Sequence, residues 1–121
     1  MAETRVIPIF RIFDYQKAIE FYIVWLGFKI DWEHKFGENP PLYMQVSKGD
    51  IILHLSEHHG DSAPGSKAYI ETTDVTNYHK ELMAKKYKFN RPGLEKVPWN
   101  APCMEVIDPF SNKLMFTEKG K

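Results

Sequence analysis

The stretch that decides the fold is Asp108-Pro109-Phe110-Ser111-Asn112-Lys113-Leu114-Met115-Phe116. Asp108-Pro109 predicts a tight turn, because proline presets one backbone angle and an aspartate can hydrogen-bond to its own backbone. Apolar residues resume at Leu114 and Phe116 with a period of two, which predicts a final strand. Met115 lies between these two residues and is therefore expected on the other side of that strand.

The same order of elements is expected twice along the chain. The first copy has a strand over 6–13, a helix that begins after Asp14 and ends at Gly27, and strands over 28–36, 42–47 and 51–56. The second copy has a strand over 67–72, a helix capped by Asp74, and strands near 87–90, over 103–107 and from 113 onward. The pattern predicts two βαβββ units, an internal repeat visible in element order more than in residue identity.

We therefore expect a single α+β domain over residues 1–121. Its first module spans about 1–58, a polar linker rich in Gly, Pro and His spans about 57–66, and its second module spans 67–121. One helix on each four-stranded mixed sheet leaves the other sheet face uncovered. Two such concave sheets side by side would form a cleft, the usual kind of place for a ligand.

Composition excludes several classes of function. The formal net charge is zero, which argues against nucleic-acid and membrane-surface binding, since both normally need a basic patch. The one cysteine, Cys103, cannot form an intrachain disulfide, and no apolar run approaches the roughly 20 residues of a membrane span. The first residues lack the pattern of a signal peptide, so we expect a cytoplasmic protein.

Two stretches carry a family resemblance. The first is Asp14 with Ala18-Ile19-Glu20-Phe21-Tyr22 and Leu26-Gly27-Phe28. The second is Trp99 with Asp108-Pro109 through Asn112. They are similar to the opening and the closing signature, respectively, of the vicinal oxygen chelate superfamily. This superfamily comprises the glyoxalases and the bleomycin-resistance proteins. The resemblance covers nearly the whole chain. It implies paired βαβββ modules in a homodimer, with a cleft on the concave sheet face.

The resemblance also implies where a divalent metal would bind. Enzymes of the family take His or Glu ligands from the first and last strands of each module, and those positions fall here on Ile7, on Lys67, on Met115, and on or next to His54. An alkyl chain, an ammonium group and a thioether do not suit a hard or borderline cation. The resemblance therefore implies no metal and no other cofactor, and it weighs against an enzyme.

Family members that lack the ligands include the bleomycin-resistance proteins, which the chain resembles in length, in Pro8 on the first strand and in Trp99. We expect a metal-free protein that binds an antibiotic-like small molecule and gives resistance by sequestration. In some of these proteins the first strand crosses to the partner subunit around such a proline, so strand exchange in the homodimer stays open. Binders of cationic bleomycin tend to be acidic and this chain is neutral, so the identity of the ligand also stays open.

Two alternatives remain at this point. One is a metal-dependent lyase or dioxygenase of the same superfamily with a displaced ligand set around His54, His58 and Glu105. The other is a structural dimer with a closed cleft. His58 and His59 lie in the polar linker, where adjacent histidines rarely converge on one metal.

The predicted ligand-binding residues are His54, Trp99, Glu105, Met115, Trp32 and Phe36. The three aromatic side chains could stack on a planar ligand, and His54 titrates near neutrality. Glu105 could pair with a cationic ligand, or instead with Lys113 or a nearby arginine. Core or dimer packing is the alternative for the aromatic residues, core packing is the alternative for Met115, and a satisfied, partly buried histidine is the alternative for His54. No catalytic residue is predicted, since Cys103 has no partner base identifiable in the sequence.

Overall fold

The structure is a computed structural model that describes residues 4–35, 41–85, 92–93, 95–96 and 101–118. The chain divides into two compact units, Met1–Pro64 and Gly65–Lys121, each built around a four-stranded sheet. Within the described ranges, no helix is long and apolar enough to cross a membrane.

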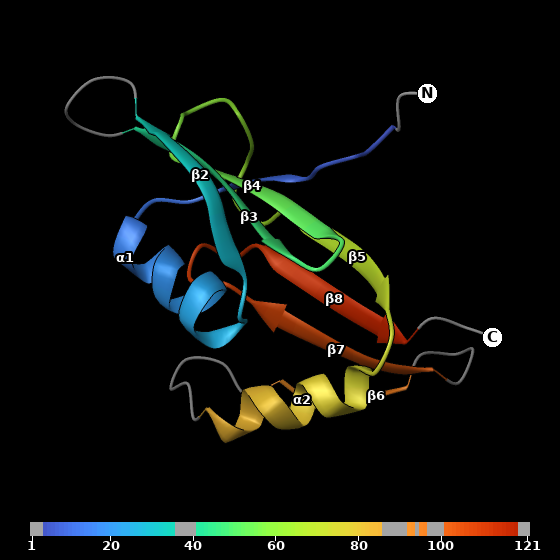
Figure 1. Ribbon diagram of the computed structural model, residues 1–121. Helices are drawn as coiled ribbons and strands as arrows, with labels where there is room; N and C mark the ends of the chain where they lie inside the picture. The colour runs from blue at the N-terminus through green and yellow to red at the C-terminus, as the bar shows by residue number, and fades with distance from the viewer. Residues whose placement is uncertain (1–3, 36–40, 86–91, 94, 97–100, 119–121) are drawn as a thin grey trace. The chain divides into compact units, whose positions relative to one another are not determined.

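The first unit contains a mixed sheet in the order β1-β4-β3-β2 (Figure 1). Its strands are β1 (Ile9–Arg11), β2 (Lys29–Lys35), β3 (Leu42–Lys48) and β4 (Ile51–Ser56). β1 runs parallel to β4, and the other neighbours are antiparallel. β1 is shorter than the predicted strand over 6–13 and begins just after Pro8, a residue without an N–H to donate to a ladder.

The helix of the first unit begins as predicted, because Oδ1 of Asp14 accepts a hydrogen bond from the backbone N–H of Lys17 at 3.0 Å. One turn of α-helix, α1 (Tyr15–Ala18), continues directly into a π-helical segment, η1 (Ile19–Trp25). The chain then leaves the helix at Gly27, whose φ of 87° suits glycine. The side chains of Phe21, Tyr22 and Trp25 are buried and supply much of this unit's core.

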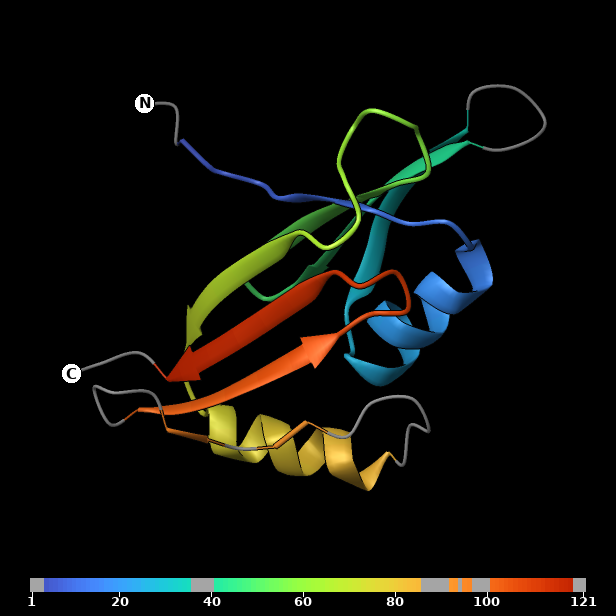
Figure 2. The same ribbon diagram turned by 180° about the vertical axis from the view of Figure 1, so that it is seen from behind.

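The second unit repeats the order βαβββ in a sheet with the order β5-β8-β7-β6 (Figure 2). Its elements are β5 (Lys67–Thr72), α2 (Val75–Ala84), β6 (Glu95–Lys96), β7 (Pro102–Ile107) and β8 (Lys113–Glu118). α2 packs on β7 and β8, where the rings of Tyr78 and Phe116 meet edge to face at 5.3 Å. The predicted pair of βαβββ modules is thereby confirmed. The predicted strand near 87–90 lies outside the described residues, and β6 was not predicted.

The start of α2 differs from the prediction that Asp74 caps it. Asp74 has a left-handed backbone (φ 61°), and its side chain accepts no capping hydrogen bond from the helix backbone. The carboxylate of Glu118 instead accepts from the backbone N–H groups of Asp74 and Val75, each at 3.0 Å. Glu118 ends β8, so a residue distant in sequence satisfies the free N–H groups at the helix start.

The turn between β7 and β8 is organised by Asp108, as predicted. Oδ1 of this buried carboxylate accepts hydrogen bonds from the backbone N–H groups of Phe110 and Asn112, both at 2.8 Å. Oδ2 accepts from the side-chain amide of Asn112 at 2.9 Å. The carboxylate thus holds the backbone of the turn that starts the final strand.

Candidate functional site

His54 lies in the middle of β4 on a sheet face rich in polar and aromatic side chains. In the register of the sheet, His54 is the partner of Gln45 on β3 and of Ile9 on β1. Alternation along the strands places further side chains on this face. We call it the polar face of the first sheet and define it by Asp31, Trp32, Tyr43, Gln45, Ser47 and His54.

Both ring nitrogens of His54 are engaged in hydrogen bonds. The hydroxyl of Tyr43 lies 2.7 Å from Nδ1, and Oε1 of Gln45 lies 3.0 Å from Nε2. Partial burial lowers the pKa of His54, and the positive charge of Arg5 lowers it further. The imidazole is therefore neutral at neutral pH, with one nitrogen a donor and the other an acceptor.

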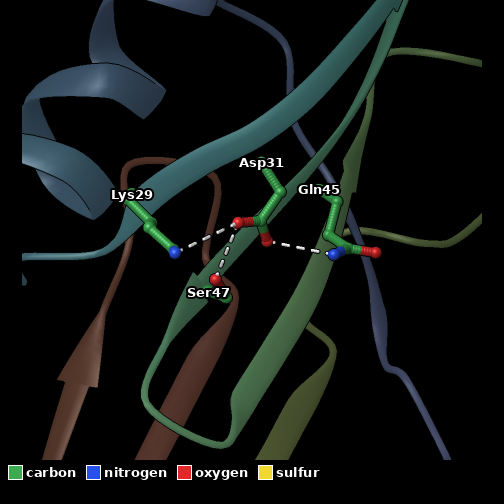
Figure 3. A network of polar contacts seen from close by, with 4 residues as sticks. All are labelled: Lys29, Asp31, Gln45 and Ser47. Atoms are coloured by element: carbon green, nitrogen blue, oxygen red, sulfur yellow. Dashed lines mark hydrogen bonds and ion pairs between the residues drawn. The ribbon is translucent and has the colours of Figure 1, made fainter.

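Asp31 joins the polar face through an irregularity in β2. The register between β2 and β3 shifts between Ile30 and Trp32, so Asp31 is an extra residue on its strand. Its carboxylate points toward β3, where it accepts hydrogen bonds from Nε2 of Gln45 and Oγ of Ser47, each at 3.0 Å (Figure 3). The ammonium of Lys29 lies 4.0 Å away.

These contacts keep the Asp31 carboxylate ionised. The hydrogen bond from Gln45 contributes most to lowering its pKa, followed by the one from Ser47, and the charge of Lys29 adds to both. An ionised carboxylate only accepts hydrogen bonds. Asp31 therefore dictates which way its neighbours orient their polar atoms.

Trp32 provides the exposed aromatic surface of the polar face. Its side chain is 43% exposed, a large value for a tryptophan on a sheet. The ring lies 5.3 Å from the imidazole of His54 in an edge-to-face arrangement, and its plane is within 10° of the ring plane of Tyr43 at 6.0 Å. Burial, and secondarily the charge of Asp61, raise the pKa of Tyr43, so its phenol keeps its proton.

The second unit carries two predicted site residues, and these lie side by side. Glu105 on β7 and Met115 on β8 are cross-strand partners, and Tyr69 on β5 is the next residue along the same row. The ammonium of Lys67 lies 2.8 Å from the carboxylate of Glu105. The cation beside Glu105 is thus Lys67, in place of the predicted Lys113 or arginine.

The structure brings together His54 with Trp32 in the first unit and Glu105 with Met115 in the second. Trp99 and Phe36, also predicted as ligand contacts, lie outside the described residues. Sequence reasoning missed Tyr43, Gln45 and Asp31. The alternation of Tyr43, Gln45 and Ser47 with apolar neighbours on β3 was a signal for the first two, whereas the extra residue in β2 left no mark in the sequence.

The histidines of the linker have local roles in the loop. Oγ of Ser56 donates to the carboxylate of Asp61 at 2.6 Å and accepts from the backbone N–H of His58 at 3.0 Å. His59 forms an isolated β-bridge with Ser62. The carboxylate of Asp61 thus anchors the linker to the end of β4.

The residues at the family's metal positions do not fit a metal. The ring nitrogens of His54 are held by Tyr43 and Gln45, and Lys67 is a cation paired with Glu105. Ile7 and Met115 offer no oxygen or nitrogen side-chain atom. Among the described residues, no three His, Cys, Asp or Glu side chains gather into a group that could hold a metal ion.

Comparison with solved structures finds the same fold in antibiotic-binding proteins. A bleomycin-binding protein in complex with bleomycin has a TM-score of 0.75 at 18% identity, covering 98% of this chain and 100% of that one. A bleomycin resistance determinant encoded on the transposon Tn5 has a TM-score of 0.77 at 17% identity, with coverage of 98% and 100%. TnmS3, an antibiotic binding protein from Streptomyces sp. CB03234, has a TM-score of 0.76 at 23% identity and covers 99% of each chain.

At these identities the likeness establishes the fold. A sequence comparison with curated proteins found no significant match. The model of the glyoxalase superfamily, in contrast, matches residues 1–121. With its two βαβββ units and a match over its whole length, the chain is a member of the glyoxalase superfamily.

Proposed function

We propose that this protein binds an antibiotic-like small molecule without a metal and protects by sequestration, in the manner of the bleomycin-resistance proteins. The observation that carries the proposal is the polar face of the first sheet. There, an exposed tryptophan lies beside a neutral histidine whose nitrogens are both engaged in hydrogen bonds. Such a surface offers stacking area and fixed polar atoms, the usual ingredients of a small-molecule site.

The side chains of this face are suited to binding more than to chemistry. Both ring nitrogens of His54 are engaged by Tyr43 and Gln45, so a substrate would have to displace one of these partners before it could use the imidazole as a general base. The ring of Trp32 adds apolar area with a defined orientation and loses little entropy when a planar ligand covers it. Antibiotic binding by solved proteins of the same fold is consistent with this role.

We also propose Glu105 and Met115 as ligand contacts of the second unit. Glu105 supplies a partly exposed carboxylate and Met115 an adaptable thioether next to it. In the unliganded protein, Lys67 neutralises Glu105. A cationic group on the ligand would compete with Lys67 for this carboxylate.

The experiment that tests the proposal is a thermal-shift screen of antibiotics, bleomycin included, with EDTA and separately with divalent metals. A ligand that binds only the folded state raises Tm by mass action, and we expect the rise to persist in EDTA. Trp32→Ala should remove most of the rise for an active ligand. Val24→Ala, which truncates a side chain that is 66% exposed on η1, is the matched control and should keep it.

Two results would overturn the proposal. One is a panel in which no compound raises Tm. The other is a stoichiometric divalent metal that chelator removes and His54→Ala prevents from rebinding, which would point to the lyase or dioxygenase alternative.

A further inference from the structure

A continuous chain of hydrogen bonds crosses the polar face from β2 to β4. It runs from Asp31 to Gln45 (3.0 Å), from Gln45 to His54 (3.0 Å) and from His54 to Tyr43 (2.7 Å). Each link joins side-chain atoms only. Removing the acceptor at the Asp31 end would therefore change which atoms donate and which accept at every other group of the chain.

The direction of this chain follows from the Asp31 end. The carboxylate only accepts, so Gln45 must turn its NH₂ group toward Asp31 and its carbonyl oxygen Oε1 toward His54. Facing a carbonyl oxygen, Nε2 of His54 must carry the proton, which leaves Nδ1 of the neutral ring as the acceptor. Tyr43 must then donate its hydroxyl proton to Nδ1.

We propose that Asp31 is a positioning residue that acts through Gln45 to hold His54 as the Nε2–H tautomer and to make the Tyr43 oxygen a hydrogen-bond acceptor. The reverse arrangement would place the carbonyl oxygen of Gln45 against the Asp31 carboxylate, two acceptors with no proton between them. Ser47 also donates to Asp31 but is not part of the series of hydrogen bonds that reaches His54.

The arrangement has a consequence for the ligand, and this consequence rests on the proposed function. With its proton directed at His54, the phenol oxygen of Tyr43 has only lone pairs left to offer. A molecule stacked on Trp32 therefore meets an acceptor at this position. The class of ligand favoured here is a planar ring that carries a hydrogen-bond donor, such as an N–H or a phenol.

The tautomer can be read directly in the unliganded protein by long-range ¹H–¹⁵N NMR of the imidazole rings near pH 8. We expect the His54 Nε2 shift to be that of a protonated nitrogen and the Nδ1 shift that of an unprotonated one. His54→Gln identifies the signal among the five histidines. In Asp31→Ala, the ratio of the Nε2–H to the Nδ1–H form should fall by about two- to tenfold, the range expected for the net contribution of one hydrogen bond.

Ser47→Ala is the matched control, because it removes the other hydrogen bond to Asp31 and leaves Gln45 in place. Its tautomer ratio should equal that of the wild type. Gln45→Met breaks the chain at its centre and should resemble Asp31→Ala, which gives a second reading if one variant folds poorly.

A wild-type His54 protonated on Nδ1 would overturn the inference, as would an unchanged ratio in both Asp31→Ala and Gln45→Met. An equal loss in Ser47→Ala would also overturn it. Because these spectra need no ligand, they decide the role of Asp31 independently of whether any antibiotic binds.

Discussion

The hydroxyl of Tyr43 lies 2.7 Å from Nδ1 of His54, and the two rings meet edge to face with their centroids 5.1 Å apart. The hydroxyl donates to a nitrogen that is basic only while the imidazole is neutral. This contact therefore stabilises the uncharged form of His54, in the same direction as its burial. The pair thus helps to keep a histidine on the polar face uncharged.

Tyr43→Phe removes that hydrogen bond and little else. We expect the pKa of His54 to rise toward its ordinary value, because the neutral ring loses the donor that stabilised it. The free energy of unfolding should fall by about 1 kcal/mol, the usual net contribution of one hydrogen bond. NMR titration of the histidines measures the first effect and urea unfolding the second. An unchanged or lower His54 pKa in Tyr43→Phe would contradict the assignment of Tyr43 as donor.

The lowered pKa of His54 makes stability depend on pH in a defined direction. The unfolded chain binds a proton at the ordinary histidine value of about 6.5, whereas the folded protein binds it only at lower pH. The contribution of neutral His54 is therefore complete above about pH 6.5 and is lost as pH falls toward the folded-state pKa. We expect urea midpoints to drop over this window and the drop to be smaller in His54→Gln. Equal pH dependence in the two proteins would show that other groups cause the effect.

The buried turn is expected to be the least tolerant position of the second unit. Asp108→Ala leaves two backbone N–H groups and the amide of Asn112 without their acceptor. Each buried group left unsatisfied costs about 1–3 kcal/mol, so we expect a loss of about 3 kcal/mol or more. Asp50→Ala removes an exposed aspartate from the β3–β4 turn and should change stability by less than about 0.5 kcal/mol. Denaturant unfolding of both variants gives the comparison, and similar losses would refute this role of Asp108.

The features that could be predicted from the sequence are local ones. The cap at Asp14 and the turn at Asp108 use partners within four residues, so residue type and spacing sufficed. The capping of α2 by Glu118 could not be predicted in this way, because donor and acceptor are more than 40 residues apart in sequence. Asp74 is of a residue type that commonly caps helices, but its backbone is left-handed and its side chain forms no capping hydrogen bond. Glu118 accepts from the free N–H groups instead.

The candidate site could be predicted even less fully, because it depends on contacts between residues far apart in sequence. A strict period of two would place Asp31 and Trp32 on opposite faces of β2. The register shift between Ile30 and Trp32 lets Asp31 reach Gln45 and Ser47 on the face that also carries Trp32. His54 was predicted from the sequence as a candidate ligand-binding residue. Its hydrogen-bonded partners depend on how three strands align, and no local pattern records that alignment.

The Lys67–Glu105 ion pair predicts that removal of Lys67 strengthens the binding of a cationic ligand. Lys67→Met removes the cation next to Glu105 and should change stability by only about 0–1 kcal/mol, since the pair is substantially exposed. Benzamidine, a planar cation, should then bind about two- to fivefold more tightly, because it no longer competes with Lys67. The additional substitution Glu105→Gln should remove that gain, and neutral benzamide should show none. A gain that survives Glu105→Gln would exclude Glu105 as the cation's partner.

The acceptor character of Tyr43 leads to a test with two probes of nearly the same shape. Indole carries a ring N–H and N-methylindole does not, so only indole can donate to the phenol oxygen. If both stack on Trp32, indole should bind more tightly by about two- to tenfold, the range expected for one net hydrogen bond. Tyr43→Phe should make the two affinities equal, and Trp32→Ala should weaken both. Chemical-shift titration supplies the affinities. Equal binding of the two probes to the wild type, or stronger binding of N-methylindole, would mean that the Tyr43 oxygen does not act as an acceptor toward the ligand.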